Sequence, residues 1–108
     1  MDFKEYQDKA KTTAIYPEQF KVNYPILGLS GEAGELANKY KKVLRDDNGV
    51  LKDEKRQQLV DEIGDCLWYI SAIASDLGVD LDKIATGNIE KLFSRKERGQ
   101  IKGSGDNR

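Results

Sequence analysis

Two pairs of acidic residues have the spacing of a metal-binding site. Glu32 and Glu35 lie three residues apart in the segment SGEAGEL, and Glu62 and Asp65 lie three apart in DEIGDCLW. Residues three apart are neighbours on one helix face, so two packed helices could bring all four carboxylates together. Clustered carboxylates repel one another unless a cation lies between them. The two pairs therefore predict a cation site, although either pair alone would fit a solvated helix surface.

The available ligand atoms narrow the choice of ion. The chain contains no histidine, so the site would be built from oxygen ligands. Such ligands favour hard cations, which makes Mg²⁺ or Mn²⁺ a better candidate than zinc. Both acidic pairs also lie within apolar sequence, which is less typical of a purely solvated face.

Four helices are expected to position these residues. Helix-capping residues, apolar spacing and the turn signals Asp46-Asp47-Asn48-Gly49 and Gly78 divide the chain. The predicted helices span residues 2–14, 25–45, 53–77 and 81–98. No segment shows the alternation of a strand. We therefore predict an all-α fold resembling a four-helix bundle, in one domain over residues 1–99, with a polar tail at 100–108 that is flexible alone and could order over substrate.

The second and third predicted helices each carry an apolar stripe with an acidic pair on its flank. The stripe of the second helix is Ile26, Leu29, Ala33, Leu36, Tyr40 and Val43. The stripe of the third is Leu59, Ile63, Cys66, Leu67, Ile70, Ala74 and Leu77. Packing the two stripes together would leave both acidic pairs along one groove. Cys66, the single cysteine, fits a small buried residue in a reducing compartment.

Three glycines lie inside the second predicted helix, at Gly28, Gly31 and Gly34. Each costs about 1 kcal/mol relative to alanine in a helix interior. Close packing of another helix or of a ligand would compensate, and a partly looped segment is the alternative.

Composition excludes some classes of partner. The formal net charge of −1 provides no basic field for a nucleic-acid duplex, so free nucleotides are the more plausible ligands. No apolar stretch approaches the length of a membrane span, and the first ten residues lack the apolar segment of a signal peptide. We expect a cytoplasmic protein with no membrane partner.

Four segments resemble one enzyme family. SGEAGELANKYKK, DEIGDCLWYI, NIEKLFSRKERG and GSGDNR are similar to MazG-like nucleoside triphosphate pyrophosphohydrolases, from about Tyr24 to the end. That family's signature is two acidic clusters, E-E-x-x-E and E-E-x-x-D, followed by an Asn and a Lys on a later helix. The leading acid of each cluster differs here, because Gly31 and Asp61 stand at those positions.

The resemblance implies an all-α enzyme that cleaves a nucleoside triphosphate between its α- and β-phosphates with Mg²⁺, giving a monophosphate and pyrophosphate. Its metal-binding and catalytic residues would be Glu32, Glu35, Glu62 and Asp65. We expect Glu32 or Glu35 to accept the proton of the attacking water.

The resemblance also implies substrate-binding residues on the fourth helix. Asn88 and Lys91 would bind substrate, and Arg95, one turn further, would contact phosphate. The alternative is a solvated basic face that pairs with Glu90 and Glu97.

Two further candidates lie on the acidic faces of the second and third helices. Lys39 follows Glu35 by one turn and is either an ion-pair partner or a second phosphate ligand. Tyr69 follows Asp65 by one turn and either stacks on a nucleobase or packs in the core. Trp68 lies away from the apolar stripe, where a subunit interface is its expected role.

The sequence is also compatible with other functions. All-α dUTPases and phosphoribosyl-ATP pyrophosphatases share acidic helices and cleave the same bond, and a non-catalytic helical interaction module would use the carboxylates only as a charged surface. A chain this short is also expected to complete its site by self-association, as a homodimer or a tetramer.

Overall fold

The computed structural model describes residues 1–108 and is entirely helical. Its elements are α1 (Phe3–Lys11), the short 3₁₀ helix η1 (Glu18–Phe20), α2 (Asn23–Asp46), α3 (Asp53–Asp76) and α4 (Leu81–Glu97). The predicted all-α class and the four predicted helices are confirmed, with α1 ending at Lys11 and not at Ala14. None of the helices combines the length and the apolar character needed to cross a membrane.

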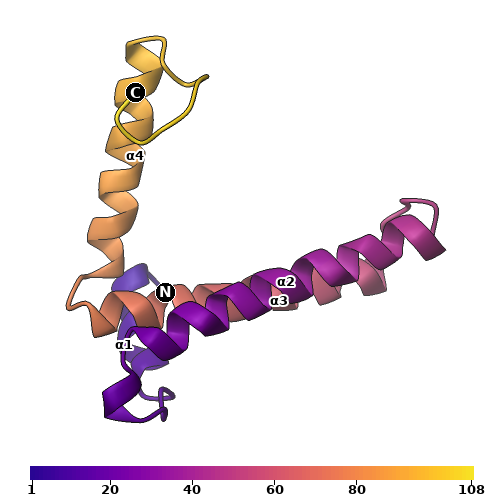
Figure 1. Ribbon diagram of the computed structural model, residues 1–108, viewed down its shortest axis with the longest axis horizontal. Helices are drawn as coiled ribbons and strands as arrows, with labels where there is room; N and C mark the ends of the chain where they lie inside the picture. Colours follow the sequence, from indigo (N-terminus) through magenta and orange to yellow (C-terminus); the bar gives the residue numbers. More distant parts are fainter.

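The long helices α2 and α3 form an antiparallel hairpin, and the other two helices meet it at one end. Figure 1 shows α2 and α3 side by side along their length, with α1 crossing them and α4 pointing away. The radius of gyration is 16.8 Å, whereas a compact domain of this length has about 13 Å. The helices therefore do not close into a compact bundle within one chain.

The direction of α4 is set at its junction with α3. Gly78 adopts φ +72° and ends α3, a backbone conformation that favours glycine. Gln7 of α1 is buried at this junction, where its side chain donates to the Val79 carbonyl at 2.9 Å and accepts from the Leu81 amide at 2.8 Å. Because both groups lie at the start of α4, Gln7 holds that helix in its outward course.

The core of the single chain is small. Its buried hydrophobic residues are Val43, Ala72, Ala74 and Leu81. The two apolar stripes are only partly covered, since Ile63 is 55% exposed and Leu77 is 59% exposed. In a hairpin each long helix has one main neighbour, which covers only the seam between them. Apolar surface on α2 and α3 is thus left without a partner.

Close packing compensates for one of the three helical glycines. A Cβ added at Gly28 would lie 2.1 Å from Cε1 of the Tyr69 ring, so the ring rests directly on the α2 backbone. A Cβ at Gly31 or Gly34 would meet nothing within 4 Å. The expected contact is confirmed at Gly28, and the other two glycines lie on an open face.

Candidate metal centre

Three of the four predicted carboxylates converge where α2 faces α3. Glu32 of α2 and Glu62 and Asp65 of α3 each offer an oxygen atom, and these oxygens lie within 4.8 Å of one another. Glu35 is exposed and lies outside this group. We call Glu32, Glu62 and Asp65 the acidic cluster.

Glu62 is the buried member of the acidic cluster, with 7% of its surface exposed. Its Oε1 accepts a hydrogen bond from Lys39 Nζ at 2.6 Å, and this contact lowers the pKa of Glu62. Its Oε2 is buried and has no hydrogen-bond partner. A buried carboxylate oxygen without a partner is rare in folded proteins, and it marks a position where a cation or water completes the structure.

The pKa of Glu32 is also affected by the closeness of the three carboxylates. Its pKa is raised by the close approach of the Glu62 carboxyl group, with desolvation and the charge of Asp65 adding to the effect. Three carboxylates, one of which has a buried oxygen without a partner, match the preference of Mg²⁺ or Mn²⁺ for carboxylate ligands. The donor set therefore fits the predicted hard cation.

Lys39 and Tyr69 both make contacts within the hairpin. Lys39 is the ion-pair partner of Glu62, which is one of its two expected roles. Tyr69 packs on Gly28, and its ring stands edge-on to Trp68, with centroids 5.0 Å apart. One face of Tyr69 is thus covered by α2, and its contact with a nucleobase stays a prediction.

The candidate residues of α4 do not reach the acidic cluster within one chain. Asn88 is exposed, and α4 points away from the hairpin that carries the carboxylates (Figure 1). Lys91 and Arg95 instead bind Asp106 of the C-terminal segment. Their role as substrate ligands stays a prediction.

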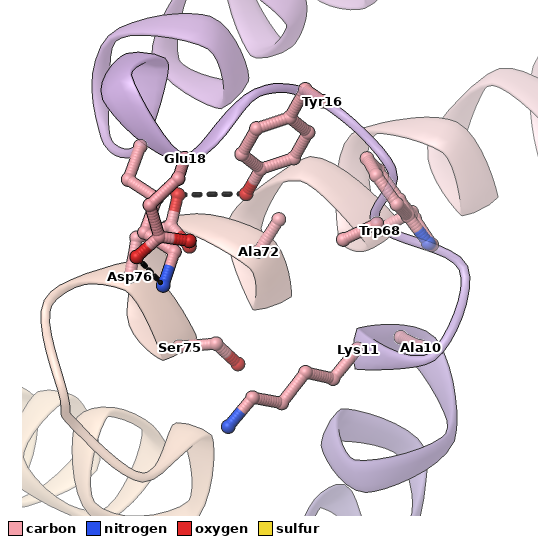
Figure 2. A pocket seen from close by; sticks show the side chains of 10 residues that line it. Ala10, Lys11, Tyr16, Glu18, Trp68, Ala72, Ser75 and Asp76 are labelled. Atoms are coloured by element: carbon pink, nitrogen blue, oxygen red, sulfur yellow. Dashed lines mark hydrogen bonds and ion pairs between the residues drawn. The ribbon is translucent and has the colours of Figure 1, made fainter.

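A cavity that the sequence patterns do not predict lies beside α3. Its volume is about 260 Å³, and it lies between α1, the segment after α1, and α3 (Figure 2). Trp68 and Ala72 line it and lie three and seven residues after Asp65, hence on the same helix face. Trp68 donates from Nε1 to Thr13 Oγ1 at 2.8 Å. The spacing of these residues in the sequence indicates that they share one face of α3. Only the fold shows that α1 packs against that face and encloses a cavity.

Asp76, which lines this cavity, stabilises the turn that precedes α2. Asp76 Oδ2 accepts hydrogen bonds from the Tyr16 hydroxyl at 2.7 Å and from the Val22 amide at 2.9 Å. Val22 has φ +70° and ψ −55°, a strained conformation for a β-branched residue. The Asn23 amide donates to the Lys21 carbonyl at 2.8 Å and closes the turn. Asp76 thus holds the strained turn from which α2 begins.

We expect Asp76→Asn to lower the free energy of unfolding by about 1 kcal/mol, because hydrogen bonds to a charged acceptor are stronger than those to a neutral one. The substitution should also lower the pKa of Tyr16, which burial and then the hydrogen bond to Asp76 raise. Urea unfolding and an ultraviolet titration of tyrosine ionisation measure the two effects. Asp53→Asn makes the same change at an exposed position and is the control. Equal stability of the two variants would contradict the role given to Asp76.

Comparisons with known proteins agree with this architecture. The MazG nucleotide pyrophosphohydrolase domain matches residues 22–99, which include the whole acidic cluster. The "Gene 37 protein" of Mycobacterium phage L5 is 49% identical over 109 residues, covering 95% of this chain and 96% of that protein. No solved structure gives a significant match. Because the domain match extends over most of the sequence, the chain belongs to the MazG nucleotide pyrophosphohydrolase family.

Proposed function

We propose that this protein is a Mg²⁺-dependent nucleoside triphosphate pyrophosphohydrolase. It would cleave a ribo- or deoxyribonucleoside triphosphate between the α- and β-phosphates and release the monophosphate and pyrophosphate. The observation that carries the proposal is the acidic cluster, in which Glu62 Oε2 is buried and unpaired between two helices of a MazG-family chain.

The charge of the cluster explains the need for a cation. A triphosphate is strongly anionic, and three bare carboxylates would repel it. A bound Mg²⁺ supplies positive charge that attracts the phosphates and polarises their oxygens. Glu32, Glu62 and Asp65 would hold the ion, with Mn²⁺ as a possible substitute and Glu35 as the expected fourth ligand.

Glu32 is our first choice for the general base. Its carboxylate belongs to the acidic cluster, so a water bound to the cation would lie within its reach for removal of a proton. Glu35 is the alternative, because it lies one turn away on α2. Once Glu62 binds a cation, Lys39 would be free to turn toward a phosphate oxygen.

Self-association would supply the remaining substrate ligands. The exposed apolar faces of α2 and α3 and the outward course of α4 support assembly into a homodimer or tetramer. Asn88, Lys91 and Arg95 of one copy would then approach the acidic cluster of another. Tyr69 keeps its proposed role as a base contact.

The test is product analysis on a panel of canonical, deoxy and modified nucleoside triphosphates, with Mg²⁺ and then with a chelator. We expect metal-dependent formation of monophosphate and pyrophosphate. Turnover restricted to dUTP or to phosphoribosyl-ATP would identify the related all-α enzymes. Diphosphate and free phosphate as products would contradict the proposed bond. No turnover from folded, assembled protein would favour the non-catalytic interaction module.

A further inference from the structure

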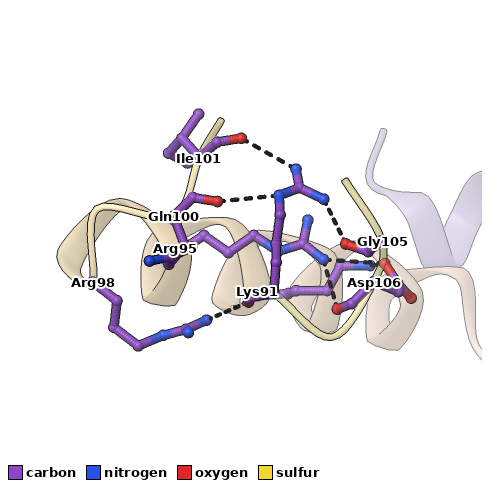
Figure 3. A network of polar contacts seen from close by, with 8 residues as sticks. Lys91, Arg95, Arg98, Gln100, Ile101, Gly105 and Asp106 are labelled. Atoms are coloured by element: carbon purple, nitrogen blue, oxygen red, sulfur yellow. Dashed lines mark hydrogen bonds and ion pairs between the residues drawn. The ribbon is translucent and has the colours of Figure 1, made fainter. Parts of the chain in front are cut away.

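The C-terminal segment folds back on α4 and places a carboxylate between two cations. Positive φ angles at Gly103 and Gly105 turn the chain, and Figure 3 shows the segment lying along the helix. The side chain of Asp106 accepts from Lys91 Nζ at 2.7 Å and from an Arg95 guanidinium nitrogen at 3.2 Å. The same guanidinium donates to the Asp106 carbonyl at 2.7 Å. We call residues 101–108 the strap.

Arg95 keeps unused hydrogen-bonding capacity beneath the strap. It is only 4% exposed, and its Nε is buried without a hydrogen-bond partner. A guanidinium carries five N–H donors arranged to grip an anion with more than one oxygen. Asp106 binds only one nitrogen of this guanidinium, so its remaining N–H groups are available to a larger anion.

The local charge is also unbalanced. Lys91 and Arg95 share the single Asp106 carboxylate (Figure 3). Arg98 and Arg108 also carry positive charge, and Arg98 donates a hydrogen bond to the Arg108 carbonyl. The Asp106 side chain is 79% exposed, so water and salt weaken its hold on the two cations. An anion with several charges would bind this group of cations more strongly than Asp106 does.

We propose that Asp106 holds the place of a phosphate group in the free protein, and that a polyphosphate displaces the strap from Lys91 and Arg95. This inference rests on the proposed function, in which these two residues bind substrate phosphate. The strap keeps the buried guanidinium paired and in position until the anion arrives. Its release then couples phosphate binding to a movement of the C-terminal segment.

The first test measures the affinity for pyrophosphate by calorimetry, with a chelator present so that the acidic cluster takes no part. Removing the competing charge with Asp106→Asn should tighten binding about 3- to 10-fold, the range expected when exposed ion pairs no longer have to be broken. Lys91→Gln should weaken binding. Glu97→Gln makes the same charge change at an exposed position on α4 and should alter affinity little. Unchanged or weaker binding by Asp106→Asn would overturn the proposal.

The second test uses the unaltered chain. Trypsin cleaves after Lys102, inside the strap, and release of the strap should raise the rate of that cleavage. We expect pyrophosphate to accelerate it several-fold, and Asp106→Asn to be cut rapidly even without ligand. Mass spectrometry identifies the fragment that ends at Lys102. Slower cleavage with pyrophosphate would show that the strap closes on the anion and would overturn the proposed displacement.

Parallel titrations separate the possible sources of phosphate. A non-hydrolysable triphosphate, pyrophosphate and orthophosphate are compared under the same conditions. Release by the first two but not by orthophosphate assigns the site to a polyphosphate of substrate or product. If polyphosphate releases the strap but the product assay shows no turnover, the proposed displacement is supported and the proposed reaction is contradicted. If turnover occurs but the strap is not released, the proposed reaction is supported and the proposed displacement is contradicted.

Discussion

Replacing Glu62 with glutamine is expected to abolish turnover while leaving the helical fold intact. The amide keeps the shape of the side chain but removes the buried charge that carries the proposed metal site. Loss of even an outer partner of a metal ligand costs roughly 10- to 100-fold in affinity or activity, so loss of a direct ligand should cost about 100-fold or more in kcat/KM. Product assays and circular dichroism measure the two properties.

Thermal unfolding gives a readout of the same site that does not depend on activity. Mg²⁺ should raise the unfolding temperature of the unaltered protein, because a ligand that binds only the folded state stabilises it. Glu62→Gln should lose this rise. Without metal its stability should change little, since the variant loses the Lys39 ion pair but also one of three repelling carboxylates.

Two further variants sharpen the comparison. Glu54→Gln makes the same change at an exposed position in the first turn of α3 and should behave like the unaltered protein. Glu35→Gln tests the predicted fourth ligand, and we expect it too to lose turnover. Retained activity in both Glu62→Gln and Glu35→Gln would eliminate the proposed metal site.

Gly28→Ala is expected to have the largest effect on stability. The added methyl group would overlap three atoms of the Tyr69 ring, the nearest at 2.1 Å. Overpacking costs about 1–3 kcal/mol, and so close an overlap with a ring lies at the upper end of that range. The better helix propensity of alanine stabilises the helix by about 1 kcal/mol and offsets part of this cost. We therefore expect a net loss of about 2 kcal/mol in the free energy of unfolding, measured with urea.

The neighbouring glycine and the ring itself provide the controls. Gly31→Ala meets no atom within 4 Å in the single chain and should stabilise the protein by up to about 1 kcal/mol. In a Tyr69→Ala background, Gly28→Ala should lose its cost, because the overlapping ring is gone. A cost that persists in that background would mean that the clash is not the cause. Destabilisation by Gly31→Ala would indicate that a second copy covers this face.

The sequence alone determines where the helices lie and which acidic residues share a helix face. Helix boundaries depend on caps, glycines and apolar spacing within a few residues, which explains why the predicted segments 25–45 and 53–77 agree closely with α2 and α3. The three-residue spacing also places Glu62 and Asp65 on one face before any packing is known. These properties are local, so the order of residues is sufficient to predict them.

The composition of the site depends on how the helices are placed against each other. The rotation and stagger of α2 against α3 bring Glu32 into the acidic cluster, leave Glu35 outside it and pair Lys39 with Glu62. The outward course of α4 and the contact of Asp106 with Arg95 arise in the same way. Such contacts join residues distant in sequence, and their geometry is the sum of many small packing energies. No local pattern encodes that sum, so only the tertiary structure decides it.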